Sequence, residues 1–238
     1  NKNPEFDVHI HVGIPSEYQK KAPFSVCVTA GIETDRVSHE WLIATHQGMD
    51  RLVVPSNHAK SGFTETHYEM INETQNTKTE ISCNVPVEVV PYPIKEVAPQ
   101  DLEFSTDTEF NFLCISLLGA RKNMENMVKW FVEEFRNENV GLILKTSRTN
   151  GSRMDRNFTL NHFKKLLNSY SDRKCKVYLL HGDLTEEQIH SLYLRKDVHA
   201  FMSATHGEGY GLPIFESAYY GLPVVATDWS AHLDFLTA

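Results

Sequence analysis

The sequence has few cysteines and no long apolar run. Its 238 residues include only 4 cysteines, which lie far apart and show no C-x-x-C spacing of the kind that binds zinc or carries redox chemistry. There is also no run of about 20 apolar residues, the length that a transmembrane helix requires. These absences argue against a paired-cysteine zinc site and a membrane-spanning helix. We expect a cytoplasmic protein with reduced core thiols, and the sequence leaves open a peripheral contact with a membrane.

Positive charge is also scarce. The 23 lysines and arginines are outnumbered by 31 aspartates and glutamates, which gives a formal net charge of −8. Because domains that bind nucleic acid present basic surfaces, this balance argues against a nucleic-acid partner. The sequence lacks an Asp-x-Asp motif as well, and hard cations such as Mg²⁺ need clustered oxygen ligands. We therefore expect chemistry that uses no metal.

The alternation of strand-like and helix-like segments predicts an α/β fold with parallel sheets. Runs rich in Val and Ile, such as residues 7–14 and 24–31, are typical of buried strands, and helical patterns separate them. Residues 97–109 mix Pro, Asp, Ser and Thr without periodicity, which indicates a linker. We predict two Rossmann-like domains, residues 1–105 and residues 106–238.

The first domain contains two further expected elements. A helix is predicted from Asn57 to about Ile71, where Ala59, Phe63 and Met70 share one side. The polar, turn-rich residues 72–80 are expected to form an exposed loop.

The most distinctive stretch runs from His206 to Asp228 and begins with a glycine loop. Glycine occupies every second position from 207 to 211, so the backbone there can take positive φ angles and approach a ligand closely. Pro213 is expected in the first turn of a helix that ends at Gly221, a residue suited to the C′ position. The N–H groups at such a helix start carry about half a positive charge. The stretch therefore predicts a site for phosphate or diphosphate.

This stretch contains two carboxylates of interest, Glu208 and Glu216. Glu208 lies in the loop and Glu216 in the helix, with seven residues between them. We expect Glu216 in the first helical turn, where complementarity to the helix dipole is by itself a sufficient reason for a carboxylate. The pattern of residues from 208 to 216 thus leaves a structural and a functional interpretation of Glu216 open.

The whole stretch resembles the signature of glycosyltransferase family 4, which comprises retaining sugar-nucleotide transferases of the GT-B fold. That signature has Glu, Gly, an aromatic residue, Gly, Leu, Pro and a second Glu after seven residues. The resemblance implies that Glu208 holds hydroxyls of the donor sugar and that Glu216 holds the ribose of the nucleotide. It also implies that the backbone around the diphosphate is supplied by Gly209, Tyr210, Gly211 and Leu212.

Arg121 and Lys122 form a second candidate phosphate site. They fall between the first strand and first helix of the second domain, the edge at which parallel sheets bind nucleotides. Positive charge is mildly disfavoured at a helix start, so another reason for it is needed. The resemblance agrees, since the family has Arg-Lys-Asn or Arg-Lys-Gly at this place, although Ser116 and Leu117 replace its usual Gly-Arg. Arg148, Arg153 and Arg156 are interpreted as a solvated surface run, and a donor-side role is kept as the alternative.

The first domain offers candidate catalytic residues. His9 and His11 share one face of a strand, and the family often carries a His on the matching strand beside the reacting sugar, so His11 is a candidate. The alternative is a pair of partly buried strand histidines. Glu33 follows a strand end, where ligands gather, and the alternative is a loop that caps the next helix.

Together these features predict a fragment of a GT-B glycosyltransferase with a nearly complete donor domain, an incomplete acceptor-side domain and both ends cut. The expected donor is a nucleotide sugar such as a UDP- or GDP-sugar, bound as a substrate, with no separate cofactor. The acceptor, a glycan, a lipid or a small molecule, is open. Two alternatives are kept: a sugar-nucleotide epimerase with the same fold and a non-catalytic binder of nucleotide sugars.

Overall fold

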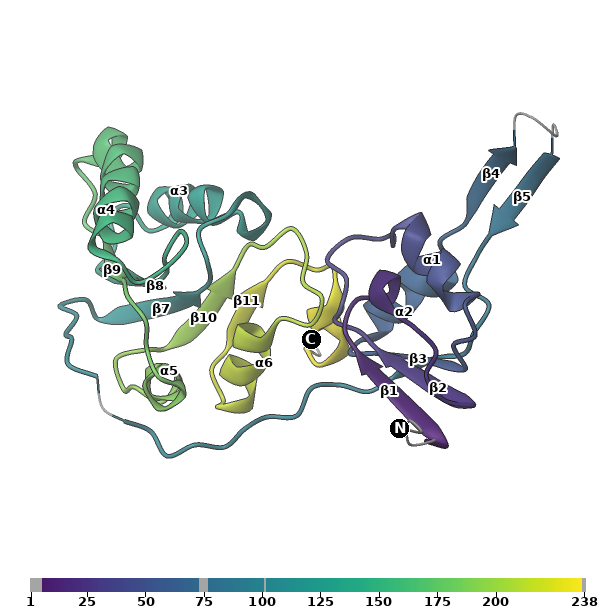
Figure 1. Cartoon of the computed structure of the whole chain (residues 1–238). Helices are drawn as coiled ribbons and strands as arrows, with labels where there is room; N and C mark the ends of the chain where they lie inside the picture. Colours follow the sequence, from purple (N-terminus) through teal and green to yellow (C-terminus); the bar gives the residue numbers. More distant parts are fainter. Residues whose placement is uncertain (1–5, 73–76, 101, 237–238) are drawn as a thin grey trace. The chain divides into compact units, whose positions relative to one another are not determined.

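Parallel strands alternate with helices along the chain and form two separate sheets (Figure 1) in the computed structural model, which describes residues 6–72, 77–100 and 102–236. Each sheet belongs to its own unit. Of the described residues, unit 1 holds those up to Pro93, together with Gly207–Gly211 and those from Trp229 onward. Unit 2 holds Ile94–His206 and Leu212–Asp228. The predicted domain boundary near residue 105 stays a prediction. No helix in the described ranges is long and apolar enough to cross a membrane.

The sheet of unit 1 has four parallel strands in the order β1-β2-β3-β6. The elements of this part are β1 (Val8–Val12), β2 (Phe24–Val28), α1 (His39–Thr45), β3 (Arg51–Val54), α2 (Asn57–Thr64) and β6 (Val87–Val89), with a short 3-10 helix at Pro15–Glu17. The predicted rhythm of strand, helix and strand is confirmed. The core forms where Cys27, Leu52 and Phe63, all fully buried, pack together.

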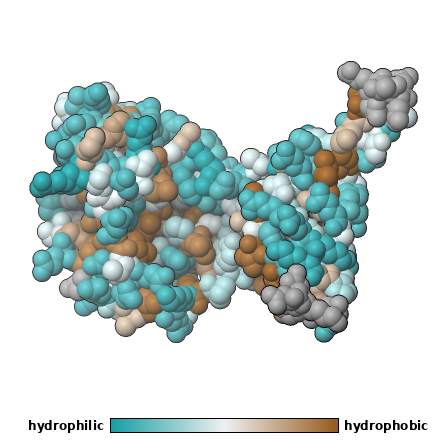
Figure 2. Space-filling model, in the orientation of Figure 1, coloured by the Kyte–Doolittle hydropathy of each residue, from teal (hydrophilic) through white to brown (hydrophobic). Residues whose placement is uncertain are grey.

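Strand β1 is inverted relative to its predicted burial. Val8, Ile10 and Val12 are 54%, 62% and 78% exposed, whereas His9 and His11 are half-buried. Apolar surface is visible in this region (Figure 2). The register pairs His11 with Cys27 and Cys27 with Leu52, so the histidines lie on the face that carries the core. The expectation of a buried strand is therefore wrong for its apolar residues, because β1 is an edge strand and only its histidine face packs on the described core.

The chain after α2 also differs from expectation. The helix ends at Thr64, and Tyr68–Asn72 (β4) pairs antiparallel with Thr77–Ile81 (β5). Thr66 donates its hydroxyl to the Gly62 carbonyl and thereby replaces a helical hydrogen bond at the helix end. The predicted continuous helix to Ile71 is wrong, and part of the predicted polar loop is a strand. Cross-strand pairing decided this, with Lys78 and Glu69 in contact at 3.0 Å.

Unit 2 is a five-stranded parallel sheet in the order β11-β10-β7-β8-β9, with α3 and α4 on one side and α5 and α6 on the other (Figure 1). Its elements are β7 (Phe110–Ile115), α3 (Met124–Glu134), β8 (Val140–Lys145), α4 (Arg153–Leu167), β9 (Lys176–Leu180), α5 (Glu186–Tyr193), β10 (Ala200–Ser203), α6 (Leu212–Tyr219) and β11 (Val224–Ala226). The predicted Rossmann-like domain is confirmed, and Thr185 with Gln188 forms a capping box at the start of α5. Strand order reverses between β7 and β10, and such a switch point is where ligands bind.

Asp155, a buried residue of α4, ties the strand-end loops of unit 2 together. Its carboxylate accepts hydrogen bonds from the backbone N–H groups of Arg148 at 3.0 Å and Thr149 at 2.7 Å, just after β8. His181, which follows β9, lies 2.7 Å from the same carboxylate. The His181 hydrogen bond, with the backbone donors, holds the pKa of Asp155 well below its usual range. The loop after β8 is therefore fixed by one charged side chain.

We expect Asp155→Asn to lower the melting temperature of the chain by several degrees at pH 7, since Asn cannot accept from this set of donors with a full charge. Because the folded-state pKa of Asp155 is below the unfolded value of about 3.9, its contribution is complete above that pH and is lost as the pH falls further. Thermal unfolding of both proteins from pH 7 to pH 3 should show the difference shrinking. Asp172→Asn, at an exposed pair with Arg136, is the matched control. Equal losses in the two variants would contradict the central role of Asp155.

Candidate functional site

The glycine loop Gly207–Gly211 packs directly on the backbone of the loop after β2. A Cβ atom on Gly31 would lie 1.9 Å from the carbonyl oxygen of Gly209, and one on Gly207 would lie 2.1 Å from that of Glu33. Only Gly211 of the three loop glycines has a positive φ, at 90°. Gly207 and Gly209 are thus required for a close approach of protein backbone, which the sequence interpretation had assigned to a ligand.

Within unit 1, Ser230 fixes the backbone of Glu208 by two hydrogen bonds. The N–H of Glu208 donates to the Ser230 hydroxyl at 2.7 Å, and that hydroxyl donates to the Glu208 carbonyl, also at 2.7 Å. Ser230 has φ 99° and ψ −172°, a region that essentially only glycine occupies, so it is strained. Glu208 itself is 7% exposed. Ser230 is therefore strained at the point where it fixes the backbone of Glu208, the candidate sugar-binding residue.

The start of α2 supports the same loop. Ser56 caps the helix by accepting from the Ala59 N–H at 3.1 Å and donates its hydroxyl to the Gly209 carbonyl at 3.1 Å. Next to it, the His58 ring meets the edge of Trp229 at a centroid distance of 4.9 Å, and burial lowers the pKa of His58. These contacts gather three segments of unit 1 that are far apart in the sequence.

The side chain of Tyr210 serves packing. It is 6% exposed, its ring meets those of Tyr92 and Phe235 at 5.1 Å and 5.3 Å, and its hydroxyl donates to the Tyr92 carbonyl at 3.4 Å. Burial raises the pKa of Tyr210. Any contact of Tyr210 with a donor would therefore come from its backbone, as the resemblance implies.

His11 and Glu33 lie at carboxyl ends of neighbouring strands of unit 1. The rings of His9 and His11 both adjoin Tyr18, at 6.2 Å and 5.9 Å. Within the described ranges, Nδ1 of His9 and Nε2 of His11 are buried without a hydrogen-bond partner. A buried unpaired nitrogen has a cost and calls for a reason. Catalytic roles for His11 and Glu33 stay predictions.

In unit 2, the two loops at the switch point are hydrogen-bonded to each other. The Arg121 carbonyl accepts from the His206 N–H at 2.8 Å and from the Thr205 hydroxyl at 3.4 Å. Arg121 and Lys122 are half-buried in the 3-10 helix Ala120–Lys122 between β7 and α3, where the sequence placed them. Their proposed contact with phosphate stays a prediction.

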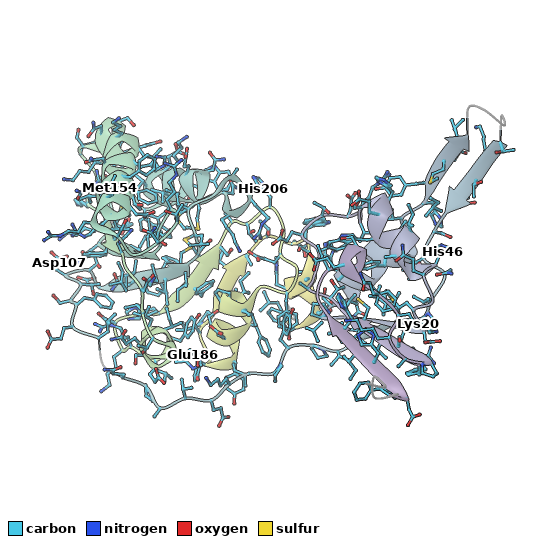
Figure 3. All side chains as sticks on the ribbon, in the orientation of Figure 1. Lys20, His46, Asp107, Met154, Glu186 and His206 are labelled. Carbon is cyan, nitrogen blue, oxygen red and sulfur yellow. The ribbon has the colours of Figure 1, made fainter. Side chains whose placement is uncertain are left out.

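A cavity of about 450 Å³ opens beside these loops, entirely within unit 2. Its lining includes Gly119 and Ala120 from the loop after β7, Arg148 after β8, Phe158 of α4, and His206 after β10, which is labelled in Figure 3. Arg148 is exposed, as the sequence indicated, and it also lines this cavity, which no local pattern marks. Among the described residues, no three His, Cys, Asp or Glu side chains are grouped to hold a metal ion.

Helix α6 starts one residue before Pro213, at Leu212, and Gly221 follows it with φ 84° as predicted. Glu216 is therefore the fifth residue and lies outside the first turn, which corrects the sequence expectation. The dipole effect decays within that turn. Complementarity to the helix dipole is thus a weak reason for Glu216.

Tyr193, the last residue of α5, holds Glu216. Its hydroxyl donates to Oε2 of Glu216 at 2.8 Å, and the tyrosine is 2% exposed. Burial raises the pKa of Glu216, and the Tyr193 hydrogen bond partly offsets that rise. Sequence reasoning missed Tyr193, because a tyrosine at the end of an amphipathic helix is ordinarily interpreted as core.

Two Rossmann-like units, together with a glycine loop that follows the switch-point strand β10 in the chain, define an α/β protein of the GT-B type. The family model for glycosyl transferases group 1 matches residues 103–237, more than half of the chain. The chain belongs to this family, and the predicted resemblance and fold class are confirmed. No curated protein sequence matches the chain significantly.

Solved glycosyltransferase structures share the fold at low sequence identity. TarM matches with a TM-score of 0.59 and 17% identity over 96% of this chain and 43% of its own. HepE from Anabaena, solved with UDP and glucose, has a TM-score of 0.57 and 12% identity over 90% and 56%. A trehalose-6-phosphate synthase, analysed for glycosyltransfer with retention, has a TM-score of 0.52 and 11% identity over 87% and 60%. The chain therefore spans about half the length of these proteins.

We expect Gly31→Ala to destabilise the chain by about 1–3 kcal/mol, the usual cost of overpacking, because its methyl group would meet the Gly209 backbone and not a flexible side chain. Hydrogen exchange of residues 207–211 should accelerate in this variant. Gly119→Ala is the control, since a Cβ there meets no atom within 4 Å. A Gly31→Ala protein with unchanged stability and exchange would show that the loop is not packed as described.

Proposed function

We propose that this chain is the donor-binding part of a glycosyltransferase that moves a sugar from a nucleotide sugar to an acceptor. One observation carries the proposal: both glutamates of the signature are held by dedicated contacts. The strained Ser230 fixes the backbone of Glu208, and the buried Tyr193 fixes one carboxylate oxygen of Glu216. Strain and buried hydrogen bonds of this kind are costly, and functional sites are where they concentrate.

In this proposal the cations of unit 2 and the start of α6 bind the diphosphate. Arg121 and Lys122 sit at the switch point, and α6 presents the N–H groups of its first turn after Gly211. As the sugar departs, negative charge builds on the leaving diphosphate. Fixed cations and dipoles stabilise that charge without reorganising, so no metal ion is required.

The two glutamates divide the rest of the donor. Glu216, with Oε2 bonded to Tyr193, offers its other oxygen to ribose hydroxyls, and Glu208 orients the sugar. His11 and Glu33 are the proposed catalytic residues of unit 1. Retention at the anomeric carbon is supported by the signature and by the retaining chemistry for which a trehalose-6-phosphate synthase of this fold was analysed. A cytoplasmic location is supported by four free cysteines.

A screen of nucleotides tests the proposal directly. We expect UDP, GDP or a sugar nucleotide derived from them to bind with a chelator present. Ligand at about 100 times its dissociation constant should stabilise the fold by about 2.7 kcal/mol. Thermal unfolding of the 238-residue chain with and without each nucleotide measures this. Absence of stabilisation by every nucleotide, with and without Mg²⁺, would sink the proposed function.

The two glutamates should give different ligand profiles. Glu216→Gln is expected to weaken nucleoside diphosphate and sugar nucleotide alike, by about 1–3 kcal/mol, because ribose is present in both. Glu208→Gln should leave the nucleoside diphosphate affinity nearly unchanged and remove the extra affinity for the correct sugar nucleotide. Calorimetry with both ligands provides the comparison.

Glu186→Gln, at an exposed residue of α5 paired with Lys95, is the control for loss of a carboxylate. Identical ligand profiles for the Glu208 and Glu216 variants would contradict the division of roles. Normal nucleotide binding by Glu216→Gln, with only a lower melting temperature, would make Glu216 a purely structural residue.

A further inference from the structure

An exposed cation, Arg148, lines the cavity of unit 2. Arg148 lines it together with Gly119 and Ala120, the residues that directly precede Arg121 and Lys122. Glu125 lines the same cavity and pairs with His162 at 3.1 Å, and among the described residues no ion pair involves Arg148. An arginine that lines a cavity without an acidic partner has its hydrogen-bond donors available to a ligand.

The Arg148 side chain is preorganised at both ends. At its base, the carboxylate of Asp155 accepts the backbone N–H groups of Arg148 and of the two residues that follow, at 3.0, 2.7 and 3.3 Å. At its tip, the guanidinium carbon lies 4.3 Å from the centroid of the Phe158 ring. A guanidinium over an aromatic face keeps its N–H edge free for the two-pronged recognition of an oxyanion.

We propose that Arg148 is a phosphate-binding residue of this cavity, acting with Arg121 and Lys122 on the diphosphate of the donor. The inference rests on the proposed function and adds a residue from the loop after β8 to it. Leu117, in the loop after β7, is 59% exposed and brings no charge, so Arg148 supplies a cation from a neighbouring strand end. Asp155 acts through Arg148 as a positioning residue.

Calorimetry of the 238-residue chain with UDP, GDP, uridine, guanosine and inorganic pyrophosphate tests this assignment. For the nucleoside diphosphate that binds, Arg148→Gln should weaken affinity by roughly tenfold to a hundredfold, the range of a charge-assisted hydrogen bond. Its affinity for the matching nucleoside should stay within about twofold of the parent, because the nucleoside carries no phosphate. Arg153→Gln, an exposed arginine five residues further along, is the control with the same loss of charge and should bind like the parent.

A second variant separates ligand contact from folding. Phe158→Leu keeps an apolar side chain and removes the ring, so it should weaken diphosphate binding less than Arg148→Gln does. In the Arg148→Gln background it should cause no further loss, since the ring acts by holding the guanidinium. Arg148→Lys should restore part of the affinity, as it keeps the charge without the fork.

Each remaining result decides a different question. If Arg148→Gln and Arg153→Gln both bind diphosphate like the parent, Arg148 is a surface residue and the inference fails while the proposed function stands. If Arg148→Gln weakens nucleoside and diphosphate equally, the assignment to phosphate is wrong. If the parent binds pyrophosphate through Arg148 and binds no nucleotide, the proposed function fails and the anion site stands. Binding of neither would overturn both.

Discussion

Backbone packed against backbone is the constraint on which the candidate site of unit 1 depends. The glycine loop crosses the loop after β2. A Cβ atom on Gly31 would clash with the Gly209 backbone, and one on Gly209 would clash with the Gly31 backbone. Such a crossing buries peptide groups, which must find partners. Ser56 supplies a donor to the Gly209 carbonyl, and Ser230 supplies both a donor and an acceptor to Glu208. The position of the Glu208 backbone is thus set by main-chain packing and by hydrogen bonds that do not involve its carboxylate.

In unit 2, hydrogen bonds to the Arg121 carbonyl and to the buried Asp155 carboxylate fix the loops at the strand ends. The sheet gives two adjacent strand-end loops at the switch point, and hydrogen bonds to the Arg121 carbonyl join them. Asp155 then organises the next loop through backbone N–H groups. The result is a cavity lined by Arg148, whose backbone N–H is held by Asp155, and by Gly119 and Ala120, which precede Arg121 in the chain.

Strand β1 has an inverted burial pattern. Its Val and Ile residues are exposed, and its histidines occupy the face that a stable sheet would fill with apolar side chains. Two buried imidazole nitrogens have no hydrogen-bond partner in the described parts of the chain. Parallel sheets are ordinarily covered on both faces, so an edge strand with this inverted pattern is unusual.

The sequence by itself determined the alternation of strands and helices, the capping box of α5, the glycine that follows α6 and the signature from Glu208 to Glu216. These are local signals, since periodicity, caps and motif spacing are read within a few turns of chain. Tertiary structure decided which glycines serve packing, that Glu216 lies beyond the first turn, and that Asn57 begins a helix of only eight residues. It also decided the partners of the two glutamates, because Ser230 is 22 residues from Glu208 and Tyr193 is 23 residues from Glu216. Contacts over such separations depend on how the sheets bring strand ends together, and no local pattern encodes them.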